Sequence, residues 1–201
     1  MSSRAAVVEG TLTGGVPYLR LGQGPALFVA AGLTAEHANP TGVSRQMALS
    51  WAAPFSDHFT VYLVNRRPGL AQGTSVSELA ADYAAAIESD IGEPVFLHGT
   101  STGGSVSLQL SIDRPDLVRR MVLAAAACRL SPEGRAAMDE VARLTAAGDK
   151  RKAMARMAAA GSTPRLGLLT RPAAWGSCLP GEGGVVSNGA AGASVLRWAA
   201  C

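Results

Sequence analysis

The sequence is short of the residues that mark disulfide-rich, metal-binding, nucleic-acid-binding and membrane proteins. Its three cysteines cannot all pair with one another and have neither metal-ligand nor redox spacing, which fits a reducing compartment. No aromatic residue lies among the basic side chains of residues 114–171, so a surface for stacking nucleic-acid bases is missing. No apolar run approaches the length of a membrane span. We therefore expect a cytoplasmic globular protein with no metal site, no nucleic-acid partner and no membrane partner.

The end of the chain has no histidine and a single acidic residue. The only histidines are His37, His58 and His98, and residues 161–201 contain no Asp, His, Lys, Ile, Phe or Tyr. Glu182 is the only acid in that segment, and its glycine- and alanine-rich runs are typical of linkers. We expect residues 161–201 to be an irregular low-complexity tail. Our hypothesis is that it is replacement or out-of-frame sequence that follows a truncation.

The rest of the chain has the pattern of an α/β protein. Residues 26–31 and 60–64 are continuous apolar runs, which predict parallel strands covered on both faces. Residues 5–11 and 17–21 alternate and predict a leading hairpin. Apolar residues recur at helical spacing over 75–88, where Ser75 and Glu78 form a capping box and Gly92 ends the helix.

The pentapeptide Gly99-Thr100-Ser101-Thr102-Gly103 follows an apolar strand-like run and precedes a helix-like run. A serine on such a strand-to-helix corner exposes its Oγ, and glycines two residues before and after it let the backbone turn tightly. A phosphate-binding loop is the weaker interpretation, because Ser105 stands where that loop would need lysine. Ser101 is therefore the candidate nucleophile.

Further segments resemble the α/β-hydrolase superfamily, from about residue 16 to about residue 161. Residues 22–33 resemble its third strand and oxyanion loop, residues 59–65 its fourth strand, and residues 114–123 the end of the elbow helix with the sixth strand. Two departures stand out. The usual His-Gly of the oxyanion loop reads Ala-Gly at residues 31–32, and the Asp-x-x-Gly-x-Gly loop is replaced by Asn-Arg-Arg-Pro-Gly at residues 65–69.

The resemblance implies an α/β-hydrolase fold, a mostly parallel sheet with helices on both faces, here lacking the last strands. It divides the chain into a core at 1–130, a helical cap-like segment at 131–160 and the tail at 161–201. It also implies a cofactor-free serine hydrolase that acts on a small ester, lactone or related acyl substrate. The backbone N–H groups of Thr102 and Leu33 would hold the oxyanion.

The acid and the base of a catalytic triad are not identifiable. The family order is serine, then acid, then histidine, whereas all three histidines precede Ser101. His37, after the oxyanion loop, is the one candidate for a substitute base. His98 is expected to be a buried structural histidine, and His58 to lie at the opposite edge of the sheet. Because losing a triad member costs about a millionfold in turnover, we expect a very poor hydrolase.

Two other interpretations stay open. One is a non-catalytic product, either truncated or a ligand-binding homologue, and the other is a cofactor-free lyase or perhydrolase that uses the same serine. If the last strands are absent, the strand at 121–126 is an exposed apolar edge. We therefore also expect self-association through that edge.

Overall fold

The computed structural model describes residues 6–34, 36–71, 73–160 and 184–187. The chain divides into two compact units. The first contains residues 6–127 together with the strand at 184–187, and the second begins at Cys128 and is described to residue 160. This division falls after Ala127, whereas the sequence analysis placed it after residue 130.

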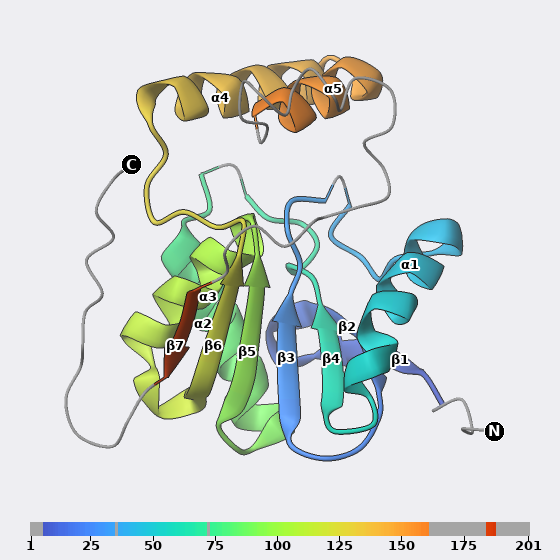
Figure 1. Ribbon diagram of the computed structural model, residues 1–201. Helices are drawn as coiled ribbons and strands as arrows, with labels where there is room; N and C mark the ends of the chain where they lie inside the picture. Colours follow the sequence, from blue (N-terminus) through green and yellow to red (C-terminus); the bar gives the residue numbers. More distant parts are fainter. Residues whose placement is uncertain (1–5, 35, 72, 161–183, 188–201) are drawn as a thin grey trace. The chain divides into compact units, whose positions relative to one another are not determined.

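The first unit is built on one seven-stranded sheet with the order β1-β2-β4-β3-β5-β6-β7 (Figure 1). The four neighbouring strands β4, β3, β5 and β6 run parallel, and β1, β2 and β7 pair antiparallel at the two sides. The predicted α/β class is confirmed. The strands are β1 (Val8–Leu12), β2 (Val16–Leu21), β3 (Ala26–Ala30), β4 (Thr60–Val64), β5 (Val95–Thr100), β6 (Val118–Ala124) and β7 (Gly184–Ser187).

The predicted leading hairpin is confirmed. β1 pairs with β2 from Val8 opposite Arg20 to Leu12 opposite Val16. The turn between them is a single 3-10 turn, Thr13–Gly15, in which Gly14 and Gly15 have φ of 77° and 79°. Positive φ at both positions favours glycine, so the Gly-Gly pair fixes where the chain reverses.

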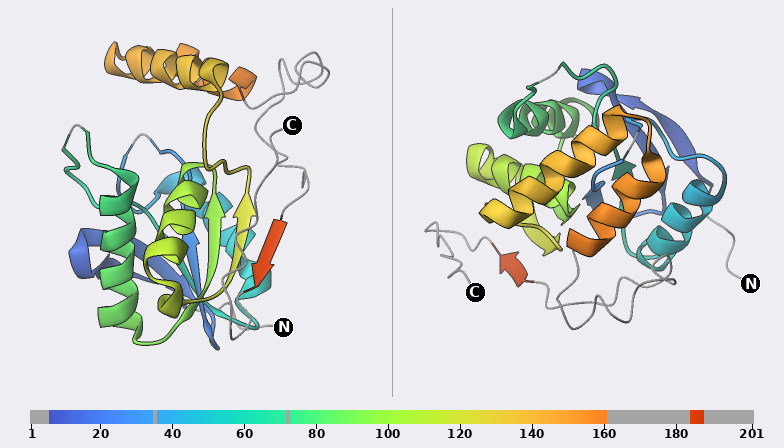
Figure 2. Two further views of the ribbon diagram at one scale, coloured as in Figure 1. Left: turned by 90° about the vertical axis from the view of Figure 1, so that its left-hand side faces the viewer. Right: turned by 90° about the horizontal axis from the view of Figure 1, so that it is seen from above.

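Helices cover both faces of this sheet. In the views of Figures 1 and 2, α2 (Val76–Ala86) and α3 (Thr102–Asp113) lie on one face and α1 (Gly42–Ala52) lies on the other. The larger buried cluster forms against α2 and α3 and includes Phe28 and Tyr83, whose rings meet edge to face at 5.3 Å. A smaller cluster lies against α1. Short turns occupy Ala53–Phe55 and Pro115–Leu117.

The local signals around α2 are confirmed. Ser75 accepts from the backbone N–H of Glu78, and the Glu78 carboxylate accepts from the backbone N–H of Ser75, so both halves of the capping box form. α2 continues into a π-helical turn, Ile87–Ile91, and Gly92 ends it with φ 74°. No described helix is both long enough and apolar enough to cross a membrane.

The described part of the second unit, up to residue 160, forms two helices, α4 (Pro132–Ala146) and α5 (Lys150–Ala160). Ser131 caps α4 by accepting from the backbone N–H of Gly134 at 3.1 Å, as its place before Pro132 predicts. Ala137 and Val141 of α4 and Ala153 of α5 are buried. The role of this pair as an active-site cap stays a prediction.

The expected irregular tail at 161–201 needs one correction, at the four residues of it that the structure describes. Gly184–Ser187 form β7, which pairs antiparallel with residues Arg120 to Leu123 of β6. The segment contains two β-branched valines, and the outer edge of β6 offers unpaired backbone groups. Self-association through a free edge of β6 would therefore require β7 to be displaced, and it stays a prediction. The rest of the expected tail lies outside the described residues.

Candidate active site

Ser101 stands on a strained corner between β5 and α3. Its φ of 52° and ψ of −122° lie in a region that side-chain-bearing residues rarely adopt. The Ser101 N–H donates to the carbonyl of Ala124 on the neighbouring strand at 2.9 Å, which holds the corner against β6. The side chain is exposed. The corner therefore presents the hydroxyl to solvent at the carboxyl end of the parallel strands.

The glycines on either side of Ser101 allow this corner to form. A Cβ at Gly99 would lie 2.5 Å from the Cα of Gly104, and a Cβ at Gly103 would lie 2.3 Å from the carbonyl oxygen of Ala30. Neither distance is tolerable for a carbon atom. The backbone of α3 thus approaches β3 and β5 more closely than any larger residue allows, which is the reason the sequence pattern needs glycine at both positions.

The loop after β3 lies against the same corner. A Cβ placed on Gly32 would be 3.4 Å from the Cβ of Ser101. The next residue, Leu33, is exposed, and Thr102 occupies the first position of α3, where helix geometry supplies no carbonyl for its N–H. Both predicted oxyanion donors therefore belong to segments that adjoin Ser101, and their role stays a prediction.

Two consecutive residues after β4 hold the loop in place. The Asn65 side-chain amide donates to the Thr34 hydroxyl at 3.2 Å and to the carbonyls of Glu36 and Ala38 at 3.1 and 3.0 Å. Arg66 Nη2 donates to the carbonyl of Gly32 at 3.1 Å and to the Thr34 hydroxyl at 3.2 Å. An aspartate at position 65 could not donate these bonds, so the asparagine suits this loop.

His37 is brought to Arg66 rather than to Ser101. Arg66 Nε donates to His37 Nε2 at 3.3 Å, so that nitrogen uses its lone pair on the guanidinium. Burial and the positive charge of Arg66 lower the pKa of His37, and a backbone hydrogen bond with Arg67 opposes them. His37 therefore lies at the predicted loop, with one ring nitrogen already engaged.

The other two histidines lie away from the corner. His98 is half-buried on β5, with its ring 5.0 Å from that of Trp51 on α1, and burial lowers its pKa. Its Nδ1 is buried without a hydrogen-bond partner. His58 is exposed just before β4, at the edge of the parallel strands opposite Ser101. Among the described residues, which include all three histidines, no hydrogen bond joins a histidine to the Ser101 hydroxyl.

Arg66 and Asn65 are candidate site residues that the sequence pattern does not reveal. Residues 65–69 stand out in the sequence only as a departure from the family loop, because the bonds of Arg66 and Asn65 reach residues about thirty positions earlier in the chain. The available signal was the placement of polar side chains directly after an apolar strand. Buried polar residues at that place are unusual, and Asn65 and Arg66 are 6% and 3% exposed.

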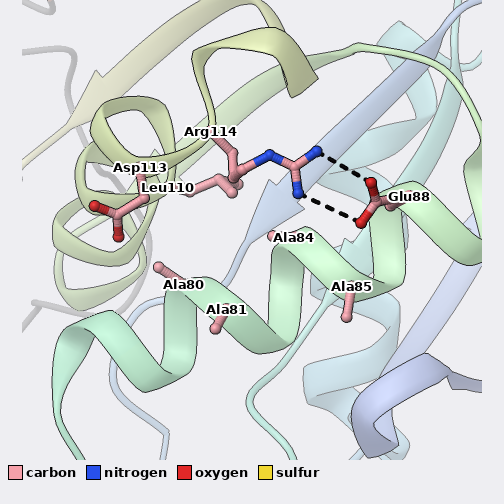
Figure 3. Close-up of a pocket in the computed structure, with 8 residues that line it drawn as sticks. All are labelled: Ala80, Ala81, Ala84, Ala85, Glu88, Leu110, Asp113 and Arg114. Carbon is pink, nitrogen blue, oxygen red and sulfur yellow. Dashed lines mark hydrogen bonds and ion pairs between the residues drawn. The ribbon is translucent and has the colours of Figure 1, made fainter.

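A surface groove of about 320 Å³ lies between α2 and α3, apart from these residues (Figure 3). Arg114 bridges its rim by donating to both oxygens of Glu88, at 3.4 and 3.1 Å. The groove contains none of the predicted site residues. Its lining comprises Ala80, Ala81, Ala84, Ala85, Glu88, Leu110, Asp113 and Arg114.

Solved structures share this fold. An α/β-hydrolase from Sphaerobacter thermophilus matches with a TM-score of 0.58 and 21% identity, over 83% of this chain and 66% of that chain. A marine microorganism esterase matches with a TM-score of 0.54 and 24% identity, over 67% and 51%. A thermophilic esterase from Thermogutta terrifontis matches with a TM-score of 0.52 and 19% identity, over 70% and 53%. The chain thus spans two thirds or less of these structures, and it has the α/β-hydrolase fold.

The sequence comparison agrees with the fold. The family model described as serine aminopeptidase, S33, matches residues 69–163, a segment that includes the Ser101 corner and both helices of the second unit. The predicted resemblance to the α/β-hydrolase superfamily is confirmed over this segment.

Proposed function

We propose that this chain is a serine hydrolase by descent that acts on a small ester or related acyl substrate without a cofactor. The observation that carries the proposal is the backbone of Ser101, held at φ 52° between a parallel strand and a helix. Strain of this kind persists where the surrounding structure imposes it, and an exposed, strained serine at a strand-to-helix turn suits a nucleophile. The similarity to esterase folds supports the reaction class.

The reaction would proceed by acyl transfer to Ser101. The hydroxyl oxygen attacks the ester carbonyl carbon, the carbonyl oxygen becomes the oxyanion, and the backbone N–H groups of Thr102 and Leu33 stabilise it. The ester C–O bond then breaks, and the leaving oxygen takes a proton from solvent water and departs as the alcohol. Water attacks the acyl-serine, which releases the carboxylic acid and restores the hydroxyl.

We further propose that turnover is impaired. The step that needs help is removal of the Ser101 proton, and His37, the one candidate base, shares its Nε2 with the Arg66 cation. Burial and that cation also lower the pKa of His37, which makes its imidazole a weaker base. Solvent water must then take the proton, and the oxyanion donors alone leave roughly a thousandfold acceleration over water.

Labelling with a fluorophosphonate probe tests this proposal. We expect slow labelling at Ser101, located by peptide mass spectrometry and abolished by Ser101→Ala. The matched control is Ser105→Ala, since Ser105 lies in the same helix turn but donates to the carbonyl of Ala127. We expect His37→Ala to leave the rate unchanged. Labelling at another residue would refute the nucleophile, and fast labelling that is lost in His37→Ala would refute the impairment.

A further inference from the structure

Arg66 is a buried cation that has no counter-ion among the described residues. Its side chain belongs to a residue that is 3% exposed, and its bonds go to neutral acceptors: the carbonyl of Gly32, the hydroxyl of Thr34 and the imidazole of His37. Nη1 is buried and has no hydrogen-bond partner. A guanidinium removed from water needs an anion to offset the lost hydration.

The neighbouring acidic groups do not supply that anion. Asp82 is paired with the adjacent Arg67, whose Nε lies 2.7 Å from its carboxylate. Burial raises the pKa of Tyr83 to about 12, so its buried hydroxyl stays neutral. Glu36 is exposed, and only its backbone carbonyl accepts from this cluster. Within the described part of the chain, Arg66 therefore has no carboxylate partner.

Arg66 is also close to the nucleophile. Its Nη2 donates a hydrogen bond to the carbonyl of Gly32. A Cβ placed on Gly32 would lie 3.4 Å from the Cβ of Ser101, so Gly32 lies between Arg66 and the serine. His37, which is half-buried, accepts a long 3.3 Å bond from Arg66 Nε and also has a backbone hydrogen bond with Arg67. A charged oxygen in place of that imidazole nitrogen would accept a shorter and stronger bond.

We propose that Arg66 binds the carboxylate of a ligand beside Ser101. The carboxylate would replace the His37 imidazole as the group that accepts a hydrogen bond from Arg66. The ligand class is then an acyl compound that carries a carboxylate, such as a monoester of a short dicarboxylic acid. The planar guanidinium suits a carboxylate because it can donate two parallel bonds to it. That the ligand is a substrate rests on the proposed function, whereas the binding of the carboxylate does not.

The first test is a proton NMR titration of the full chain with succinate as the probe and succinamide, its neutral diamide, as the control. Burial and the Arg66 cation both lower the pKa of His37, so a bound carboxylate that offsets the cation should raise that pKa and shift the His37 C2 proton resonance saturably. The exposed His58, at the opposite edge of the sheet, provides a resonance that should not move. Succinamide should shift neither.

The second test measures how the apparent Kd for succinate depends on Arg66. We expect Arg66→Gln to weaken binding by about tenfold or more, because the charge and the fork are both lost. Arg66→Lys keeps the charge and should still bind succinate, but more weakly than the wild type does. This variant replaces Arg66→Gln in the comparison if Arg66→Gln does not fold. The matched control is the neighbouring Arg67→Gln, which should bind succinate as the wild type does.

Three results would overturn the assignment. One is a His37 resonance that succinate leaves unchanged, another is undiminished binding in both Arg66 variants, and the third is an equal response to succinamide. Inorganic phosphate provides a further arm: binding of phosphate but not of succinate would refute a carboxylate site. Failure here is distinct from failure of the proposed function, since labelling of Ser101 needs no carboxylate and succinate binding needs no nucleophile.

Discussion

The two faces of the sheet differ in how completely helices cover them. On the face that carries α2 and α3, the buried cluster extends from β1 to β6 and includes fully buried Phe28, Leu97 and Leu110. On the face that carries α1, the buried cluster includes Val29, Val61 and Ala52 but no residue of β6. Among the described residues, the α2–α3 face therefore holds the main core, and the α1 face is covered over only part of its width.

Successive residues of β6 show the difference within one strand. Met121 points to the α2–α3 face and is 4% exposed, whereas Val122, paired with His98 and on the α1 face, is 37% exposed. On α1, the apolar residues Val43, Met47 and Trp51 also remain exposed. An apolar sequence thus predicts a strand but does not tell which of its residues a helix will cover.

Two phenylalanines should give the largest contrast. Phe28→Ala on the α2–α3 face should lower the free energy of unfolding by about 3–5 kcal/mol, because it empties a fully enclosed site against Tyr83. Phe55→Ala, next to Trp51 beyond α1, should cost about 1 kcal/mol, since Phe55 is 37% exposed. Urea unfolding measures both. Equal losses would contradict the difference between the faces.

The neighbours on β6 should repeat this contrast on a smaller scale. Met121→Ala should cost about 2–4 kcal/mol and Val122→Ala less than about 1 kcal/mol, because only the first opens a cavity. Thermal unfolding of the two variants provides the comparison. If Val122→Ala proved the more damaging, a covering for the α1 face would have to exist at β6.

A substitution at Gly103 tests how tightly the α2–α3 face of the sheet is packed next to Ser101. Gly103→Ala should destabilise the protein by about 1–3 kcal/mol, because its Cβ would collide with the carbonyls of Ala30 and Ala31. Gly134→Ala is the control, a glycine in the first turn of α4 whose Cβ would have no contact closer than 3.5 Å. That variant should be neutral or more stable. A harmless Gly103→Ala would show that α3 does not lie so close to β3.

The smallest effect should be the pH dependence of stability that His98, on the α1 face of the sheet, contributes. Burial lowers the pKa of His98 from its ordinary value of 6.5, so the unfolded chain takes up its proton at higher pH than the folded chain does. The stability that neutral His98 contributes is fully present when the pH is above 6.5, the pKa of the unfolded chain. It is lost as the pH falls from there through the lowered pKa of the folded protein. The melting temperature should therefore fall between pH 8 and pH 5, and His98→Gln should flatten that fall. An unchanged profile in the variant would contradict this account.

The features that could be predicted from the sequence are those whose structure is determined by residues close together along the chain. The Ser75 capping box, the Gly92 helix end and the Ser101 corner each depend on residues within a few positions, and all three are present. The contact of Arg66 with His37 joins residues from two different loops, so no local sequence pattern predicts it. β7 was missed for the same reason, since Gly184–Ser187 pair with residues of β6 that lie far earlier in the chain.

The most direct test is steady-state turnover of 4-nitrophenyl acetate, which examines the proposal that Ser101 is a strained nucleophile without a working base. The account predicts slow hydrolysis, about a millionfold below an intact triad, that disappears in Ser101→Ala. Turnover in the ordinary enzymatic range of about 1–1000 per second would contradict it, because such rates require a general base at Ser101.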